Sequence, residues 1–176
     1  KRSIPIIVAG ESQMTDVGRL SYYEKGERKV KFFLNSVGLG FDAQVVYYAE
    51  KLADFLPGRS WVYSISVLLG ALLHSSKPLC LEADGGAYKI EDKVYTMSIA
   101  NGPYTGGGIK QTPDAVPTDG VYDVFVVVRP SFILLVKSLY RLFRNSLEGN
   151  SCLRFFKAKS LHITGSNKHR IEADGI

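Results

Sequence analysis

The strand-like segments of this sequence come in pairs joined by short turns, and helix-like segments are inserted between the pairs. Residues 15–24 and 29–40 read as two strands around the polar turn "KGER". Residues 79–84 and 93–101 read as a second pair, with "EADG" (82–85) as a plain hairpin turn. Because hairpins join antiparallel strands, this order favours an α+β, mainly β, antiparallel domain carrying helices over an alternating βαβ domain.

Two segments that follow the first hairpin have apolar residues at helical spacing. The first, "FDAQVVYYAEKLADFL" (41–56), is expected to be capped by Asp42 and ended by Pro57-Gly58. The second is expected to start near Ser60 and to contain the apolar run from Trp61 to Leu73. This run is apolar on most sides, so we expect it to be largely buried. It is shorter than the roughly 20 residues that a bilayer-spanning helix needs.

The second half of the chain returns to strands. "VYDVFVVVR" (121–129) reads as a strand that is apolar on both faces and is stopped by Pro130. Ser131 is then expected to cap an amphipathic helix over 132–147, whose basic residues come late in the helix. Two further strands are expected to close the chain, at 152–165 and 168–175.

Length, charge and cysteine content narrow the class of protein. The 176 residues have the length of a single domain, 1–176, which can bury a core without disulfides. The net charge of +5 suits an anionic ligand or an anionic membrane surface and is too small to indicate a nucleic-acid partner. Cys80 and Cys152 lie far apart in apolar runs, which predicts two buried free thiols in a reducing compartment. A cytoplasmic domain is therefore expected.

The loop "NGPYTGGGIKQTPDAVPTDGVYD" (101–123) contains three consecutive glycines, Gly106, Gly107 and Gly108. It is not a P-loop, because no Gly-Lys-Ser/Thr follows at the required spacing. It is not a dinucleotide-binding turn either, because no helix can start through the Gln-Thr-Pro at 111–113. Two interpretations stay open: a wide loop that needs positive φ, or a loop whose N–H groups face an anionic ligand.

Two Asp-Gly words could be turns or sites. "PTDGVYD" (117–123) can be a turn with Asp119-Gly120 at its tip, or a site for a hard cation that prefers oxygen ligands. "EADG" recurs at 172–175, where the bare pattern again indicates a turn. No serine elbow and no Cys/His pair is found. The three histidines lack catalytic or metal spacing and are expected at the surface or in structural positions: His74, His162 and His169.

The order of these pieces resembles a known family. "FFLNSVGLGFDAQV", a helical stretch, "MSIANGPYTGGGIKQTPDAVPTDGVYDVFVV" and finally "IEADG" resemble the diacylglycerol-kinase-like lipid kinases. This family includes bacterial diacylglycerol and phosphatidylglycerol kinases and the sphingosine and ceramide kinases. The likeness runs from about Thr15 to the last residue, and it is specific to the family without being specific to one lipid.

The resemblance implies a two-domain protein of which this chain is one part. Such kinases carry a Gly-Gly-Asp-Gly-Thr nucleotide motif and a further Asn-Asp motif on an N-terminal α/β domain, and neither motif occurs here. We therefore expect an excised C-terminal domain, an antiparallel β-sandwich with inserted helices. It would hold one wall of a cleft between the domains, and it should be inactive alone.

The resemblance also implies a metal site and a cleft-lining segment. Asp119 matches the family's metal-binding aspartate, and main-chain oxygens of Val116 and Val121 complete the implied Mg²⁺ site. This ion is usually regarded as structural or regulatory, near the site without bridging ATP. Asn101 and the loop Gly106–Gly108 match the segment that lines the cleft.

The closing motif carries the implied catalytic residue and one departure from the family. Asp174 matches the aspartate of the family's Asp-Gly-Glu motif, which is tied to catalysis. The glutamate of that motif is often assigned as the proton acceptor, and Ile176 stands at its position here, which leaves the general base unassigned. Asn35 and the turn Gly38–Gly40 match the family's opening word and are expected to position the site.

The implied activity is transfer of the γ-phosphoryl group of ATP to a lipid hydroxyl, with diacylglycerol as the first choice. Lys137, Arg141 and Arg144 could meet anionic headgroups at a peripheral membrane surface, or could simply form a solvated basic helix face. A homodimer is left open. Two alternatives remain: a kinase of a soluble substrate such as NAD, and a lipid-binding or regulatory β-sandwich without catalysis, which Ile176 would permit.

Overall fold

A computed structural model of the chain describes residues 3–10, 12–55, 61–105, 109–131, 133–135, 137, 151–165 and 169–176. The helices are α1 (Ser3–Ala9), α2 (Phe41–Phe55) and α3 (Trp61–Leu73), and residues 133–135 and 137 are also helical. The strands are β1 (Gly18–Glu24), β2 (Glu27–Phe33), β3 (Ser36–Gly40), β4 (Lys77–Ala83), β5 (Tyr88–Ala100), β6 (Tyr104–Thr105), β7 (Ile109–Lys110), β8 (Tyr122–Val128), β9 (Leu153–Ala158), β10 (Leu161–Thr164) and β11 (Ile171–Ala173). No described helix is long and apolar enough to cross a membrane.

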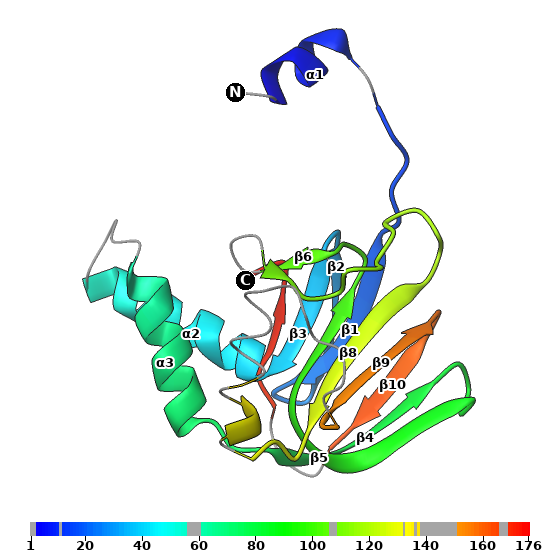
Figure 1. Cartoon of the computed structure of the whole chain (residues 1–176). Coiled ribbons are helices and arrows are strands. Elements are labelled where there is room, and N and C mark those ends of the chain that lie inside the picture. The colour runs from blue at the N-terminus through cyan, green and yellow to red at the C-terminus, as the bar shows by residue number, and fades with distance from the viewer. Residues whose placement is uncertain are drawn as a thin grey trace.

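Within the described residues, seven strands form one sheet whose paired neighbours are all antiparallel. Its order is β10-β4-β5-β3-β11, and β8 joins β5 to β9. The long strand β5 curves through the sheet (Figure 1), because its first half pairs with β4 and its second half with β3 and β8. A register shift between Val94 and Thr96 marks the change of partner.

Two apolar clusters cover the two faces of this sheet. On one face, the hairpin β1–β2 contributes Phe33 and Leu20 to a core with Leu81, Met97 and Val126 of the sheet. On the other face, α2 and α3 pack together beside β3 (Figure 1). Their apolar residues join a second core with aromatic and aliphatic residues of β5 and β8: Phe41, Val45, Val67, Tyr95, Phe125 and Val127. The predicted fold, an antiparallel β-sandwich with inserted helices, is confirmed.

Two segments that were each predicted as one strand form two strands in the structure. The segment 29–40 is broken into β2 and β3 at Leu34 and Asn35, and the segment 152–165 is broken into β9 and β10 at Lys159 and Ser160. At each break the backbone N–H groups turn to a distant carboxylate in place of a neighbouring strand. Hydrophobic alternation shifts by one residue at each break, at Asn35-Ser36 and at Lys159-Ser160, but no glycine or proline marks the turn, so each segment was predicted as one strand.

The predicted caps gave mixed results. Ser131 caps as predicted, because its hydroxyl accepts a hydrogen bond from the N–H of Leu134 at 3.3 Å. Asp42 does not precede α2 as predicted; it lies inside the first turn of a helix that begins at Phe41. Pro57-Gly58 and Ser60 lie outside the described residues. Cys80 and Cys152 are both free, with Cys152 buried and Cys80 partly buried.

Candidate active site

The predicted catalytic aspartate, Asp174, is fully engaged with the backbone of the β2–β3 break. Its Oδ2 accepts a hydrogen bond from Leu34 N at 2.8 Å. Its Oδ1 accepts from Asn35 N at 2.9 Å and from Ser36 N at 3.0 Å. Asp174 has a φ of 54°, a left-handed conformation that Asp tolerates better than most residues. The carboxylate therefore holds the turn between two strands in place.

Electrostatics support this positioning role. Burial works to raise the pKa of Asp174, but the N–H groups of Leu34, Ser36 and Asn35 outweigh it and hold the pKa below the usual value. A carboxylate stabilised in this way is a poor proton acceptor near neutral pH. The catalytic role of Asp174 stays a prediction, and the geometry assigns it to holding the backbone.

Asn101 and Asn35 hold the loop that the family resemblance predicts to line the cleft between the two domains. The side chain of Asn101 is 2% exposed, and its amide donates to the carbonyl oxygens of Asp16 at 3.0 Å and Leu34 at 3.3 Å. The amide of Asn35 donates to Tyr104 O at 3.0 Å. The flanking strands β6 and β7 pair with each other, whereas Gly106–Gly108 between them lie outside the described residues. Both asparagines therefore have structural partners.

Two carboxylates that the sequence did not single out as site residues flank Gly38 of β3. Glu172 lies opposite Gly38 in the β3–β11 register. A Cβ added at Gly38 would lie 2.3 Å from Glu172 Oε1 and 3.0 Å from Asp42 Cβ, so the glycine leaves room for both side chains. The signal in the sequence was the glycine-rich word "GLGFD", but only the strand register shows that Glu172 fills the space.

Asp42 is the carboxylate with the most unusual environment. Its Oδ2 accepts a hydrogen bond from Gln111 Nε2 at 3.2 Å, and its backbone N–H reaches Thr96 Oγ1 at 3.4 Å. Gln111 is itself 5% exposed, and its Oε1 accepts from Thr105 Oγ1 at 3.3 Å. Burial raises the pKa of Asp42 to about 6, even though the hydrogen bonds from Gln111 and Thr96 lower it. A carboxylate with this pKa can accept a proton near neutral pH.

Glu172 adds a second carboxylate with a raised pKa. Its Oε2 accepts a hydrogen bond from Gly175 N at 2.7 Å. Burial raises the pKa of Glu172, and the charges of Asp42 and Asp174 raise it further. Pairs of carboxyl groups whose environments shift their pKa values are typical of functional sites.

Of the oxygens predicted to hold Mg²⁺, those of Val116 and Asp119 already accept hydrogen bonds within the turn. The carbonyl oxygen of Val116 accepts from Thr118 N at 2.8 Å and from Asp119 N at 3.3 Å. Asp119 Oδ1 accepts from Val121 N at 3.2 Å. Gly120 has a φ of 72°, which confirms the predicted turn at Asp119-Gly120.

An ammonium group occupies the remaining side of this turn. Lys157 lies opposite Asp123 in the β8–β9 register. Its Nζ lies 3.2 Å from Asp119 Oδ2, 3.0 Å from Asp123 Oδ2 and 3.4 Å from the carbonyl oxygen of Asp114. Among the described residues, no three His, Cys, Asp or Glu side chains gather as a metal site. A divalent cation and this ammonium cannot share one place, so Lys157 would have to move for Mg²⁺ to bind, and the Mg²⁺ site at Val116, Asp119 and Val121 stays a prediction.

Known proteins of one family resemble this chain in sequence. Residues 35–176 match the family model described as YegS C-terminal NAD kinase beta sandwich-like domain. The Bacillus subtilis (strain 168) protein named "Putative lipid kinase YtlR" is 26% identical over 152 residues, which are 84% of this chain and 49% of that protein. A "Probable lipid kinase YegS-like" from Pseudomonas syringae pv. syringae (strain B728a) is 27% identical over 132 residues, 74% of this chain and 42% of that protein.

A solved structure shares the fold. The crystal structure titled as a "putative diacylglycerol kinase" from Bacillus anthracis str. Sterne superposes with a TM-score of 0.63 at 21% identity. The superposition covers 97% of this chain and 52% of that one, and this chain likewise spans about half the length of the curated relatives it matches. The resemblance read from the sequence motifs is confirmed: the chain belongs to the family of YegS C-terminal NAD kinase beta sandwich-like domains.

Proposed function

We propose that this chain is the C-terminal domain of an ATP-dependent lipid kinase that phosphorylates a lipid hydroxyl, with diacylglycerol as the preferred substrate. The names of the relatives support the reaction class, and the match to about half of their length supports a second, nucleotide-binding domain. Because the chain lacks the nucleotide motif, it is inactive by itself and forms one wall of the site.

Asp42 accepts the proton of the lipid hydroxyl in this proposal. The hydroxyl oxygen forms a bond to the γ-phosphorus of ATP, the bond from that phosphorus to the leaving oxygen of ADP breaks, and the hydroxyl proton passes to the Asp42 carboxylate. The observation that carries this assignment is the partly buried position of Asp42 beside Gln111 and Gly38, where desolvation raises its pKa to about 6. Asp174 is less suited, because both of its oxygens accept backbone hydrogen bonds.

Gln111 and Glu172 position this carboxylate. Gln111 donates to Asp42 Oδ2 and is held in turn by Thr105, so it fixes the direction of the carboxylate. Glu172 lies on the other side of Gly38, and the charge of Asp42 helps to raise the pKa of Glu172, so the two carboxylates interact. Ile176 stands at the position of the family's closing glutamate. Its side chain has no group that accepts a proton, so it cannot take over that role.

The test is Asp42→Asn in the complete protein, assayed with labelled ATP and diacylglycerol. The amide keeps the shape and can still accept a hydrogen bond, but it cannot take a proton. We expect phosphatidate formation to fall by about 10² to 10⁴-fold. Asp84→Asn is the control, because it makes the same change at a hydrogen-bonded aspartate far from Asp42, where we expect unchanged activity. Activity of Asp42→Asn within a few-fold of wild type would refute the assignment.

One observation favours a second candidate, a lipid-binding β-sandwich without catalysis. Ile176 stands where the family places its proton acceptor, and it is 76% exposed. Thin-layer assays of the complete protein with diacylglycerol, a sphingoid base and NAD separate the possibilities. Transfer to NAD alone would end the lipid proposal, and lipid binding without any transfer would favour the non-catalytic candidate.

A further inference from the structure

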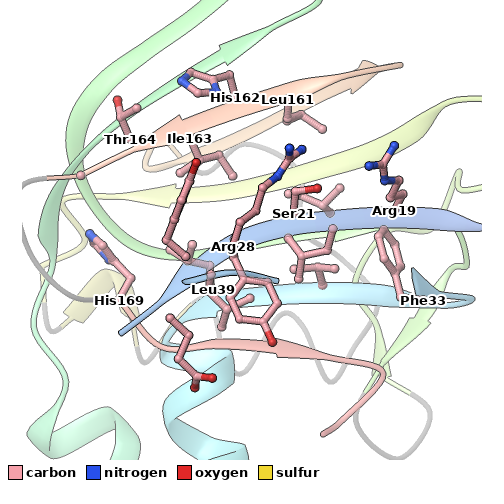
Figure 2. Close-up of a pocket in the computed structure, with 18 of the residues that line it drawn as sticks. Arg19, Ser21, Arg28, Phe33, Leu39, Leu161, His162, Ile163, Thr164 and His169 are labelled. Atoms are coloured by element: carbon pink, nitrogen blue, oxygen red, sulfur yellow. The ribbon is translucent and has the colours of Figure 1, made fainter. Parts of the chain in front are cut away.

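A large cleft lies on the face of the sheet opposite to Asp42. It has a volume of about 1370 Å³ and runs between the hairpin β1–β2 and the sheet (Figure 2). Val37 and Leu39 of β3 line it, whereas Gly38 between them faces Asp42 and Glu172. Because successive residues of a strand point to opposite faces, the sheet separates the cleft from the candidate active site.

The floor of the cleft is apolar. It is formed by aliphatic residues of β3, β5, β10 and β11: Val37, Leu39, Ile99, Leu161, Ile163 and Ile171. Leu161 and Ile163 are only partly buried, so they leave apolar surface open to the cleft. Phe33 stacks on Tyr122, with ring centroids 5.7 Å apart, and both rings line the cleft. Its volume exceeds that of most sites for small molecules and suits a long apolar group.

Cationic side chains border this floor. Arg19 and Arg28 reach from the hairpin toward β10 (Figure 2), and Lys159 lines the cleft just before β10 begins. Within the described part of the chain, none of these three side chains forms an ion pair or a hydrogen bond with another residue. The acidic residue of the lining, Glu24, is paired with Lys29. With Lys25, the lining therefore holds four cationic side chains and one carboxylate that is already paired, beside an apolar floor.

We propose that this cleft binds one anionic glycerophospholipid, at a site separate from the one where phosphoryl transfer takes place. An acyl chain lies on the aliphatic floor, and the phosphate of the headgroup lies between Arg19, Arg28 and Lys159. Charge-assisted hydrogen bonds from guanidinium groups suit a phosphate. A neutral lipid would leave all three charges without a partner, and a soluble nucleotide would leave the aliphatic floor exposed to water.

The test uses the complete protein and dihexanoyl phosphatidylglycerol below its micelle concentration, so that binding to a membrane surface does not contribute. Isothermal titration calorimetry should show binding to this probe and at least tenfold weaker binding to dihexanoyl phosphatidylcholine. The double variant Arg19→Gln/Arg28→Gln should lower the affinity for phosphatidylglycerol by about tenfold or more. The charge-matched control Lys89→Gln/Lys93→Gln, outside the cleft, should leave it unchanged.

A second variant tests the cleft itself. Ser21 is exposed and lines the cleft between the two arginines (Figure 2), so Ser21→Trp should fill the space without disturbing the core and abolish binding. Equal binding of the two lipids, or full binding by either cleft variant, would overturn the proposal. Inorganic phosphate that competes as well as the lipid would also overturn it, by showing a site for a small anion only.

The two proposals can fail separately. Asp42→Asn should keep its affinity for phosphatidylglycerol, and the arginine double variant should keep phosphoryl transfer to short-chain diacylglycerol. Displacement of the phosphatidylglycerol probe by diacylglycerol would identify the cleft as the substrate site and would overturn the assignment of a separate lipid. Loss of kinase activity in Asp42→Asn has no bearing on the cleft.

Discussion

The two "EADG" turns of this molecule have the same sequence and the same backbone conformation, but they lie in different surroundings. Asp84 and Asp174 both have positive φ, at 50° and 54°. Each carboxylate accepts backbone hydrogen bonds from a distant break between two strands: Asp84 from Lys159 and Ser160, and Asp174 from residues 34–36. The four-residue word therefore specifies a turn whose aspartate ties down another part of the sheet.

The glutamates of the two turns show where the similarity ends. Glu82 of β4 lies opposite Lys89 of β5 and pairs with its ammonium at 3.2 Å, and both side chains are about half exposed. Glu172 lies opposite Gly38, is partly buried and has Asp42 as a neighbour. The same residue is a surface ion-pair partner in one turn and a member of a carboxylate pair in the other. A turn motif fixes the local backbone, whereas the residue across the strand decides the chemistry.

The largest stability difference between the two turns should come from the aspartates. Asp174→Ala removes the partner of three backbone N–H groups, one of which belongs to the buried Ser36, and should lower the free energy of unfolding by about 3 kcal/mol. Asp84→Ala affects exposed N–H groups that water can reach, and should cost about 1 kcal/mol. Urea denaturation of both variants measures the difference. Equal losses would mean that burial does not distinguish the two turns.

Asp42, which neighbours Glu172 of the second turn, should make a distinct contribution to the pH dependence of stability. Asp42 has a pKa of about 6 in the folded protein against a reference value of 3.8, so the folded state binds more protons between these values. The contribution of Asp42 to stability is therefore greatest below about pH 4 and is lost as pH rises through 6, a change of about 3 kcal/mol. The raised pKa of Glu172 acts in the same direction.

Variants can assign this pH dependence. In Asp42→Asn the loss of stability between pH 4 and 7 should shrink, as followed by thermal unfolding in buffers of matched ionic strength. Glu172→Gln should shrink it further in combination, and Glu82→Gln should leave it as in wild type. If the stability of Asp42→Asn varied between pH 4 and 7 just as that of the wild-type protein does, the raised pKa of Asp42 would be contradicted.

The comparison also explains what the sequence could and could not predict. Hairpin spacing, helical periodicity and the order of the motifs were sufficient for the sandwich and its family. The strand breaks at Leu34 and Lys159 were missed, because each is stabilised by a carboxylate far away in the sequence. Asp42 and Glu172 were missed as a pair for the same reason: their approach depends on the register of β11 against β3, which no local pattern encodes.

The third Asp-Gly turn, at Asp119, differs from the other two in the groups that its carboxylate contacts. One oxygen takes the nearby N–H of Val121, and the other takes the ammonium of Lys157, which also contacts Asp123. These side chains are partly exposed, so Lys157→Met should change the free energy of unfolding by less than about 1 kcal/mol. This is the smallest direct effect expected among the three turns.

Lys157→Met should nevertheless change how Mg²⁺ affects the stability of this turn. Without nucleotide, Mg²⁺ should shift the melting temperatures of the wild-type protein and of Asp119→Asn by the same amount. The reason is that the ammonium of Lys157 already compensates the carboxylates of Asp119 and Asp123. In Lys157→Met, Asp119 and Asp123 lose that charge, and 10 mM Mg²⁺, an illustrative condition, should raise the melting temperature by about 3 °C. Adding Asp119→Asn to Lys157→Met should remove the gain. If Mg²⁺ instead stabilised the wild-type protein and this effect disappeared in Asp119→Asn, the metal site implied by the family resemblance would be supported. Lys157 would then have to move away when the ion binds.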